Sequence, residues 1–369
     1  MDLIYSKGEK MLDSLYAEAL KKKGQINDEL DEFKESKIQV EDKWNSEKIV
    51  PTKNNVVIAA GDGSVSKKKY LSFNFYAVAA ESLIYDETLE TIETVEIDTI
   101  PHQSFVDDRL RNKMAIFEIK NAIRALNKYE IDYYLDDGSL MGDLIRPSPS
   151  ANKLSKVQRD NIIKKVQEAV KKDIENDEDD IQSFDFKKEF PDLYEDENLD
   201  EDALTSFLEN IEKIIALSYF LKHKRQIVAI SKTSSTNEIF HVNIPDIALF
   251  DKAMKTQGFS DPYYRTVSSR VKHEFPVEDE FFRTLEFTVF FARLEDYKNI
   301  IKIELPYHAN KNEIRKILAD LKKDSVEGYP FLLKKAHNDV VIKNKDIAQL
   351  SKIVGLVEKT GREMLWWYH

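Results

Sequence analysis

The chain has 369 residues, of which 42% are hydrophobic and 33% charged, so it is long enough for one large domain or two ordinary ones with a substantial core. It contains no cysteine, which excludes disulfides, thiol nucleophiles and cysteine-ligated zinc. No apolar run reaches the roughly 18 residues of a membrane span, and the first residues do not resemble a signal peptide, so we expect a cytoplasmic protein without a membrane partner.

The net charge of −12 argues against a nucleic-acid partner only until its distribution is considered. Between Asp173 and Asp202 the chain carries 15 acidic residues and 2 lysines, a local charge of −13. The other 339 residues are therefore nearly neutral, at about +1. This composition is compatible with a channel lined by Lys and Arg outside the acidic segment.

Residues 1–50 are predicted to form an N-terminal helical arm. Leu12, Leu15, Tyr16 and Leu20 form an apolar stripe at helical spacing, which Trp44 continues less regularly. Such a stripe packs on its own domain or on a second copy of the chain. We therefore expect the arm to pack on its own domain, with dimerisation as the more specific alternative.

A β-meander is predicted over residues 55–100. Its first strand, Asn55 to Ala60, stops at Asp62-Gly63-Ser64, and a basic turn over residues 67–69 separates it from the later strands. A helix over residues 109–127 follows and carries Glu118 inside an apolar surface. A carboxylate there is costly unless it meets a cation; the alternative is a surface glutamate at the edge of the stripe.

A strand over residues 131–135 comes next and ends at Asp137-Gly138-Ser139. If this strand neighbours the first one, Asp62 and Asp137 converge, and two converging carboxylates readily hold a divalent cation. The alternative is two unrelated turns, because Asp-Gly is a common turn dipeptide.

Residues 147–202 are predicted to be an insertion. A basic helix over residues 153–172 precedes the acidic run, which we expect to be solvated, with a DNA mimic that blocks the cleft as an alternative. A helix over residues 203–224 and a strand over residues 226–230 lead to Lys232. This lysine either neutralises a phosphate or is an ordinary exposed lysine.

The last third of the chain is predicted to contain a helix and loop over residues 244–275, a hairpin over 284–305 and a helix over 312–323. A further helix begins near Tyr329 and presents Tyr329 and His337 on one face. From periodicity alone His337 is an ordinary helix histidine. Residues 346–369 form a C-terminal helix and an aromatic tail.

This order of strands, helix and acid-bearing strand predicts an α/β fold with an RNase H-like core, a mixed sheet flanked by helices, over residues 51–345. The motifs also resemble the NurA family of nucleases over about residues 50–345, apart from the acidic insertion. The resemblance depends on the following motifs in their order: Asp62-Gly63-Ser64, Glu118, Asp137-Gly138-Ser139-Leu140, Ile230-Ser231-Lys232-Thr233-Ser234, and Tyr329-Pro330 with His337.

The resemblance implies a manganese-dependent DNA nuclease, a 5′–3′ exonuclease and single-strand endonuclease that processes DNA ends in double-strand break repair. It implies a homodimer and a HerA-type hexameric ATPase as partner. By that likeness Asp62, Glu118, Asp137 and His337 are metal ligands, and Tyr329 completes the catalytic site, to which we add Lys232.

The residue types suit this chemistry, because carboxylates supply the oxygen ligands that Mn²⁺ and Mg²⁺ both accept. Imidazole serves as a ligand or as a proton shuttle. Two other functions remain open: a non-catalytic DNA clamp or scaffold of the translocase complex, and an RNase H-like enzyme acting on RNA. No Walker-type Gly-rich loop occurs, so any ATP-driven motion comes from a partner.

Overall fold

A ten-stranded mixed sheet organises the protein, which we describe from a computed structural model covering residues 2–32, 39–146, 148–177, 181, 186–195 and 199–356. Its strands follow the order β1-β7-β9-β10-β6-β5-β2-β3-β4, and β8 pairs with β9 off this path. The sheet strands are β1 (Trp44–Ser46), β2 (Ile58–Lys69), β3 (Phe73–Asp86), β4 (Thr88–Pro101), β5 (Tyr133–Asp137), β6 (Ile227–Ser231), β7 (Gly258–Ser260), β8 (Tyr263–Thr266), β9 (Glu286–Arg293) and β10 (Ile301–Leu305).

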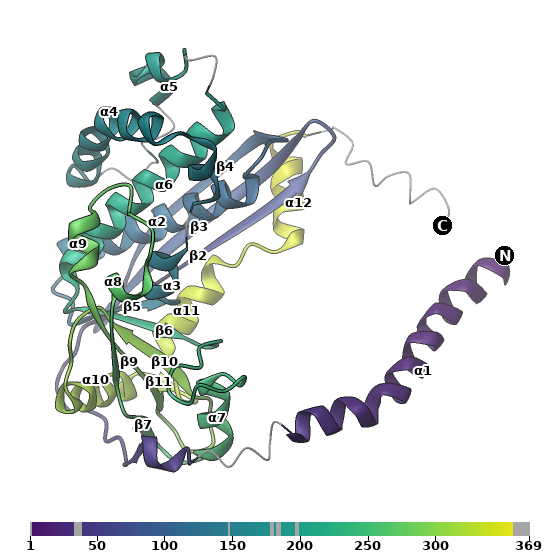
Figure 1. Ribbon diagram of the computed structural model, residues 1–369, viewed down its shortest axis with the longest axis vertical. Helices are drawn as coiled ribbons and strands as arrows, with labels where there is room; N and C mark the ends of the chain where they lie inside the picture. The colour runs from purple at the N-terminus through teal and green to yellow at the C-terminus, as the bar shows by residue number, and fades with distance from the viewer. Residues whose placement is uncertain are drawn as a thin grey trace.

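Helices cover both faces of the sheet (Figure 1). One face packs against α2 (Val106–Lys128) and α6 (Glu201–Phe220), with α4 (Lys156–Glu175) outside them; the other packs against α10 (Lys311–Lys323) and α11 (Phe331–Val340). The remaining elements are α1 (Asp2–Glu32), α3 (Leu140–Ile145), α5 (Phe186–Glu189), α7 (Asp246–Ala253), α8 (Val267–Arg270), α9 (Asp279–Arg283), α12 (Asn344–Ile353) and the small ribbon of β11 (Ser325–Val326) and β12 (Tyr329–Pro330).

The topology confirms the predicted class. β2, β3 and β4 form an antiparallel meander, and β5 and β6 then join β2 in parallel. Parallel neighbours need a crossover, which α2 supplies between β4 and β5. The mixed sheet flanked by helices is therefore the arrangement that the sequence predicts.

The first strand of the meander differs from the prediction. We expected it to end before Asp62, but β2 continues to Lys69, so Asp62 lies mid-strand and the expected basic turn is part of the strand. Twelve residues of β2 pair with β3 in one continuous register. This long pairing outweighs the local turn preference of Asp-Gly, because strand propensity depends on cross-strand context.

Three further expectations are wrong in detail. The N-terminal helix ends at Glu32, and residues 44–46 form β1, whose Trp44 pairs with Ser260. Tyr263 belongs to β8 rather than to a loop, and Tyr329 belongs to β12, ahead of the helix that carries His337. β1 and β8 depend on partners distant in the sequence, β7 and β9, which local pattern does not reveal, whereas β12 pairs with the adjacent β11 in a short ribbon.

We expected the acidic segment to be solvated, but its described parts include buried residues. Phe186 and Leu193 are buried in the largest core, together with residues of α4 and α6. The boundaries of the predicted insertion and of the other domains stay a prediction. The aromatic tail around Trp366 lies outside the described residues.

Buried ion pairs tie α2 to α4 and α6. Arg109 donates to Glu209 at 2.7 Å, and the Lys120 ammonium lies 2.6 Å from Asp173 and 3.1 Å from Glu212. We call these five residues the core ion-pair cluster. Its carboxylates are almost completely buried, and each one contacts a cation.

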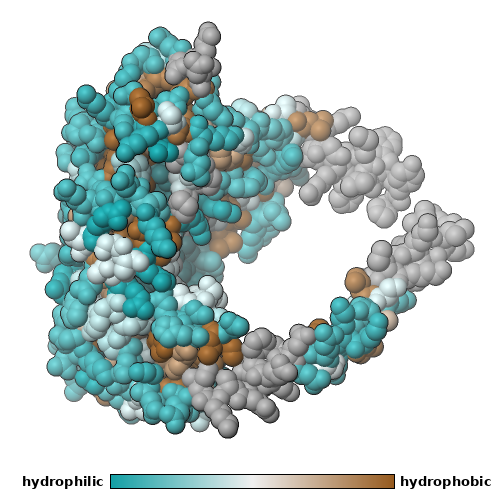
Figure 2. Space-filling view, in the orientation of Figure 1, coloured by the Kyte–Doolittle hydropathy of each residue, from teal (hydrophilic) through white to brown (hydrophobic). Residues whose placement is uncertain are grey.

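The α1 helix projects away from the rest of the protein (Figure 1). Its apolar stripe is exposed: Leu15, Tyr16 and Leu20 expose 60, 67 and 73% of their surface. Figure 2 shows hydrophobic patches along the arm, whereas most of the visible surface is hydrophilic. Among the described residues, no helix combines the length and apolar character that crossing a membrane requires.

Candidate active site

Asp62 and Asp137 lie side by side because β2 and β5 are parallel neighbours. Ile58 pairs with Tyr133 and Gly61 with Asp136, so the register continues to the two aspartates. Side chains alternate between the faces of a strand, which places Asp62 and Asp137 on the face covered by α11. The predicted convergence of these two carboxylates is confirmed.

His337 reaches the same point from α11. Its Nδ1 lies 2.6 Å from Oδ2 of Asp62, and Asp62, Asp137 and His337 each offer a ligand atom within 4.8 Å of one another. A carboxylate only accepts, so Nδ1 donates to Asp62 and Nε2 is left for a metal ion or a proton. Burial raises the pKa of Asp62, and the His337 hydrogen bond partly opposes that shift.

Lys232 and Tyr329 complete this side of the site. The Lys232 ammonium donates to Oδ2 of Asp137 at 2.7 Å and lies 5.3 Å from the centre of the Tyr329 ring. The Tyr329 hydroxyl is buried and has no hydrogen-bond partner among the described residues. Burial, followed by the charges of Asp137 and Asp62, raises the Tyr329 pKa, so the hydroxyl keeps its proton.

Glu118 approaches from the opposite face of the sheet, on α2. A Cβ atom at Gly63 would lie 2.6 Å from Oε1 of Glu118, so the carboxylate occupies the space that the glycine leaves beside Asp62. Burial raises the pKa of Glu118 well above its usual range, and Asp136 and Asp62 add to that shift. The structure thus brings Glu118 next to Asp62, but outside the close group of Asp62, Asp137 and His337.

Asp136 joins these residues, and sequence reasoning missed it. Strand alternation turns it toward α2, on the face of Glu118 rather than that of Asp137. Burial raises the pKa of Asp136 to about 8, and nearby Asp143 and Asp137 contribute. The sequence could have predicted this position, because Asp136 precedes Asp137 at the end of a strand and consecutive strand residues point to opposite faces of the sheet.

Glu304, on β10, accepts hydrogen bonds from the segment that follows Asp136 and Asp137. Its carboxylate accepts from the Ser139 hydroxyl at 2.8 Å, from the Met141 amide at 3.1 Å and from the Lys302 ammonium at 2.6 Å. Ser139 in turn caps α3 by accepting from Gly142. The turn that follows Asp137 is therefore held by a buried charged group.

Negative charge exceeds positive charge at this site. Asp62, Glu118, Asp136 and Asp137, which we call the site carboxylates, converge, whereas the adjacent cationic groups are Lys232 and, when protonated, His337. Burial, and after it the neighbouring carboxylates, raise the pKa values of Asp136 and Glu118, and a bound divalent cation would favour their ionised forms. Carboxylate oxygens and one imidazole nitrogen fit Mn²⁺ or Mg²⁺.

Comparison with known proteins identifies the family of the chain. Residues 56–342 match the NurA domain model. A probable DNA double-strand break repair nuclease NurA of Methanocaldococcus jannaschii is 30% identical over 366 residues, covering 94% of this chain and 90% of the relative. NurA of Saccharolobus solfataricus, named a DNA double-strand break repair nuclease, is 28% identical over 295 residues, covering 79% of this chain and 78% of the relative.

Solved structures share the fold. The crystal structure of the NurA nuclease from Sulfolobus solfataricus has a TM-score of 0.72 at 23% identity, covering 96% of this chain and 99% of that one. A NurA structure bound to dAMP and manganese has a TM-score of 0.67 at 16% identity, covering 98% of each chain. Since the NurA model spans most of the sequence and a relative matches nearly its whole length, the chain belongs to the NurA family of DNA double-strand break repair nucleases.

Proposed function

We propose that this NurA-family chain hydrolyses phosphodiester bonds of DNA with Mn²⁺, or with Mg²⁺ in its place, at the site formed by Asp62, Glu118, Asp137 and His337. The observation that carries the proposal is the approach of Asp62, Asp137 and His337 to within 4.8 Å of one another. The manganese-bound relative supports the choice of metal. Asp136 lies beside this site on the α2 side and adds a further carboxylate that a bound cation would help to ionise.

The metal, when bound, supplies Lewis-acid polarisation of the phosphate and a more acidic water. The residues of the chain do the remaining work. Asp62 holds the His337 ring through Nδ1, which leaves Nε2 as the atom that would ligate a metal or accept a proton. Lys232, which contacts Asp137, is placed to neutralise a phosphate oxygen, and the Tyr329 hydroxyl is a protonated donor beside it.

We further infer that the protein acts as a 5′–3′ exonuclease and single-strand endonuclease at DNA ends, as a cytoplasmic homodimer with a HerA-type hexameric ATPase. The exposed stripe of Leu15, Tyr16 and Leu20 on α1 supports a partner for the arm, since a large apolar surface of this kind favours burial. The names of the curated relatives support the repair role.

The test is cleavage of end-labelled single-stranded and duplex DNA with Mn²⁺, Mg²⁺ or EDTA, by the wild type, Asp62→Ala and Glu90→Ala. Glu90 is an exposed carboxylate at the far edge of the sheet and is the matched control. We expect metal-dependent products that Asp62→Ala abolishes and Glu90→Ala retains. Products from RNA alone would favour the RNA-directed alternative, and no products even with the ATPase added would favour the clamp.

A further inference from the structure

A cavity of about 860 Å³ adjoins the site carboxylates at the carboxyl end of β5, and most of its wall comes from the α2 side of the sheet. Asp62, Glu118, Asp136 and Asp137 line one part of it. The rest of its wall comes from α2, α3, α4, α6 and the loop over residues 272–276. The cavity thus continues from the site into the region that the predicted insertion covers.

The walls beyond the site carboxylates carry more cations than anions. Four carboxylates lie there, Asp108, Asp143, Asp160 and Glu274, against six cationic side chains from five elements, Arg111, Arg146, Lys156, Arg159, Lys213 and Lys272. The Lys213 ammonium is held in the wall by donating to the Asn112 side chain at 3.0 Å. With the four site carboxylates included, the cavity has eight carboxylates and six cations, so its cations are concentrated on the walls away from the metal-binding end. Cations placed there attract the backbone phosphates that flank the cleaved bond.

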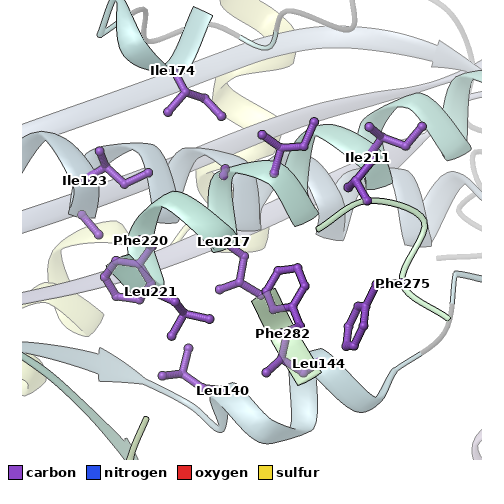
Figure 3. Close-up of a cluster of buried hydrophobic side chains, with 14 of the residues drawn as sticks. Ile123, Leu140, Leu144, Ile174, Ile211, Leu217, Phe220, Leu221, Phe275 and Phe282 are labelled. Carbon is purple, nitrogen blue, oxygen red and sulfur yellow. The ribbon is translucent and has the colours of Figure 1, made fainter. Parts of the chain in front are cut away.

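The floor of the cavity is apolar. Leu144, Leu217, Phe220 and Phe275 belong to the buried cluster in Figure 3 and also line the cavity. Proteins that bind single strands combine a cationic wall for the backbone with apolar and aromatic side chains for the bases. The volume lies in the range of about 300–1,000 Å³ typical of ligand pockets, which suits a few nucleotides of one strand and is too small for a duplex.

We propose that this cavity binds the nucleotides of a single DNA strand that adjoin the scissile phosphate, with backbone phosphates on Arg146, Lys156 and Lys272. This inference rests on the proposed nuclease function. The helix α4, within the predicted insertion, then contributes to substrate binding, although the acidic run that follows it carries the opposite charge. A duplex end must be unpaired before its strand enters.

The test replaces three exposed cations of the wall, in the variant Arg146→Gln/Lys156→Gln/Lys272→Gln. The control, Lys164→Gln/Lys224→Gln/Lys345→Gln, removes the same charge from exposed lysines that do not line the cavity. Two substrates are compared: single-stranded oligonucleotides of about 12 nucleotides, near the footprint of one strand-binding module, and bis(4-nitrophenyl) phosphate, a diester too small to reach the wall.

We expect the ratio of kcat/KM on the oligonucleotide to kcat/KM on the small diester to fall at least about tenfold in the cavity variant, as the loss of three phosphate contacts predicts. The plot of log affinity against log salt should become shallower by about 0.7 for each lost contact with a single strand. The control should match the wild type in both measurements.

Two results would overturn the inference: equal behaviour of the cavity variant and the control, or a parallel loss on both substrates. Anisotropy of a labelled oligonucleotide in EDTA measures binding without cleavage. If the wild type cleaves nothing with Mn²⁺, the nuclease proposal fails, while this binding comparison still decides whether the cavity holds a strand.

Discussion

Two groups of carboxylates, those of the core ion-pair cluster and the site carboxylates, differ in how many cations meet them. In the core ion-pair cluster, Asp173, Glu209 and Glu212 are each in contact with Arg109 or Lys120. The four site carboxylates meet mainly one another, Lys232 and His337. Paired carboxylates join helices, whereas a group with surplus negative charge is arranged for a cation from outside the chain.

Removing a site carboxylate should abolish activity without lowering stability. We expect Asp137→Asn to reduce Mn²⁺-dependent cleavage by about a thousandfold or more, since the metal supplies several kcal/mol of transition-state stabilisation. The melting temperature without metal should change little, because the change removes repulsion from Asp136 while it weakens a partly exposed pair with Lys232. Mn²⁺ should raise the melting temperature of the wild type and have less effect on the variant; a less stable, fully active variant would contradict the assignment.

Breaking the core ion-pair cluster should have the opposite pattern. Lys120→Met leaves Asp173 and Glu212 buried without their shared ammonium, at an expected cost of about 3–5 kcal/mol in the free energy of unfolding. Denaturant titration measures the loss, and activity per folded molecule should persist. Lys164→Met, on an exposed face of α4, should change stability by less than about 0.5 kcal/mol. A similarly small loss in Lys120→Met would show that this pairing is not structurally important.

A change at the junction of the two faces should affect activity more than stability. In Gly63→Ala the new methyl group meets the Glu118 carboxylate, which must move. We expect cleavage to fall by about 10–100-fold and stability by about 1–3 kcal/mol, as for other overpacked positions. Adding Glu118→Asp shortens the displaced side chain and should recover stability but not activity. Unchanged activity in Gly63→Ala would remove Glu118 from the site.

The smallest expected effect concerns Glu81, which lies opposite Asp62 on β3. Burial and Asp339 raise its pKa to about 7, and its Oε2 has no hydrogen-bond partner among the described residues. The folded state then binds a proton more tightly than the unfolded chain, so the wild type loses stability as the pH rises from about 4.5 to 7. Glu81→Gln should lack this loss, so its free energy of unfolding relative to that of the wild type should rise by about 1–3 kcal/mol between pH 4 and pH 8. Denaturant titration across this pH range measures the difference. Parallel curves of stability against pH would refute the prediction.

Much of the fold follows from local pattern. Short apolar runs, helical stripes and their order predict the meander, α2, β5 and the hairpin of β9 and β10. The adjacency of Asp62 and Asp137 follows as well, because the chain passes from the meander through one helix to β5. The continuation of β2 past Asp62 was not predictable in this way, since it depends on pairing with β3.

The missed parts of the site depend on contacts between distant segments. Asp136 gains its role from the charges around it on the α2 face, and Glu304 from donors more than 160 residues away. The pairing of Lys120 with Asp173 likewise joins residues 53 positions apart, so that part of the acidic segment lies in the core. Composition alone indicated only a solvated run.

Position 63 has a consequence for communication across the molecule. Side chains on the two faces of a sheet normally keep its two helical layers apart. Gly63 has no side chain, so the Glu118 carboxylate of α2 lies directly against the backbone of β2 at this position. A charge placed beside Asp62 from the α11 layer is therefore felt directly by Glu118 in the α2 layer. A metal ion held by Asp62 would therefore act on the Glu118 carboxylate across the sheet, so the α11 and α2 layers are linked electrostatically at this one position.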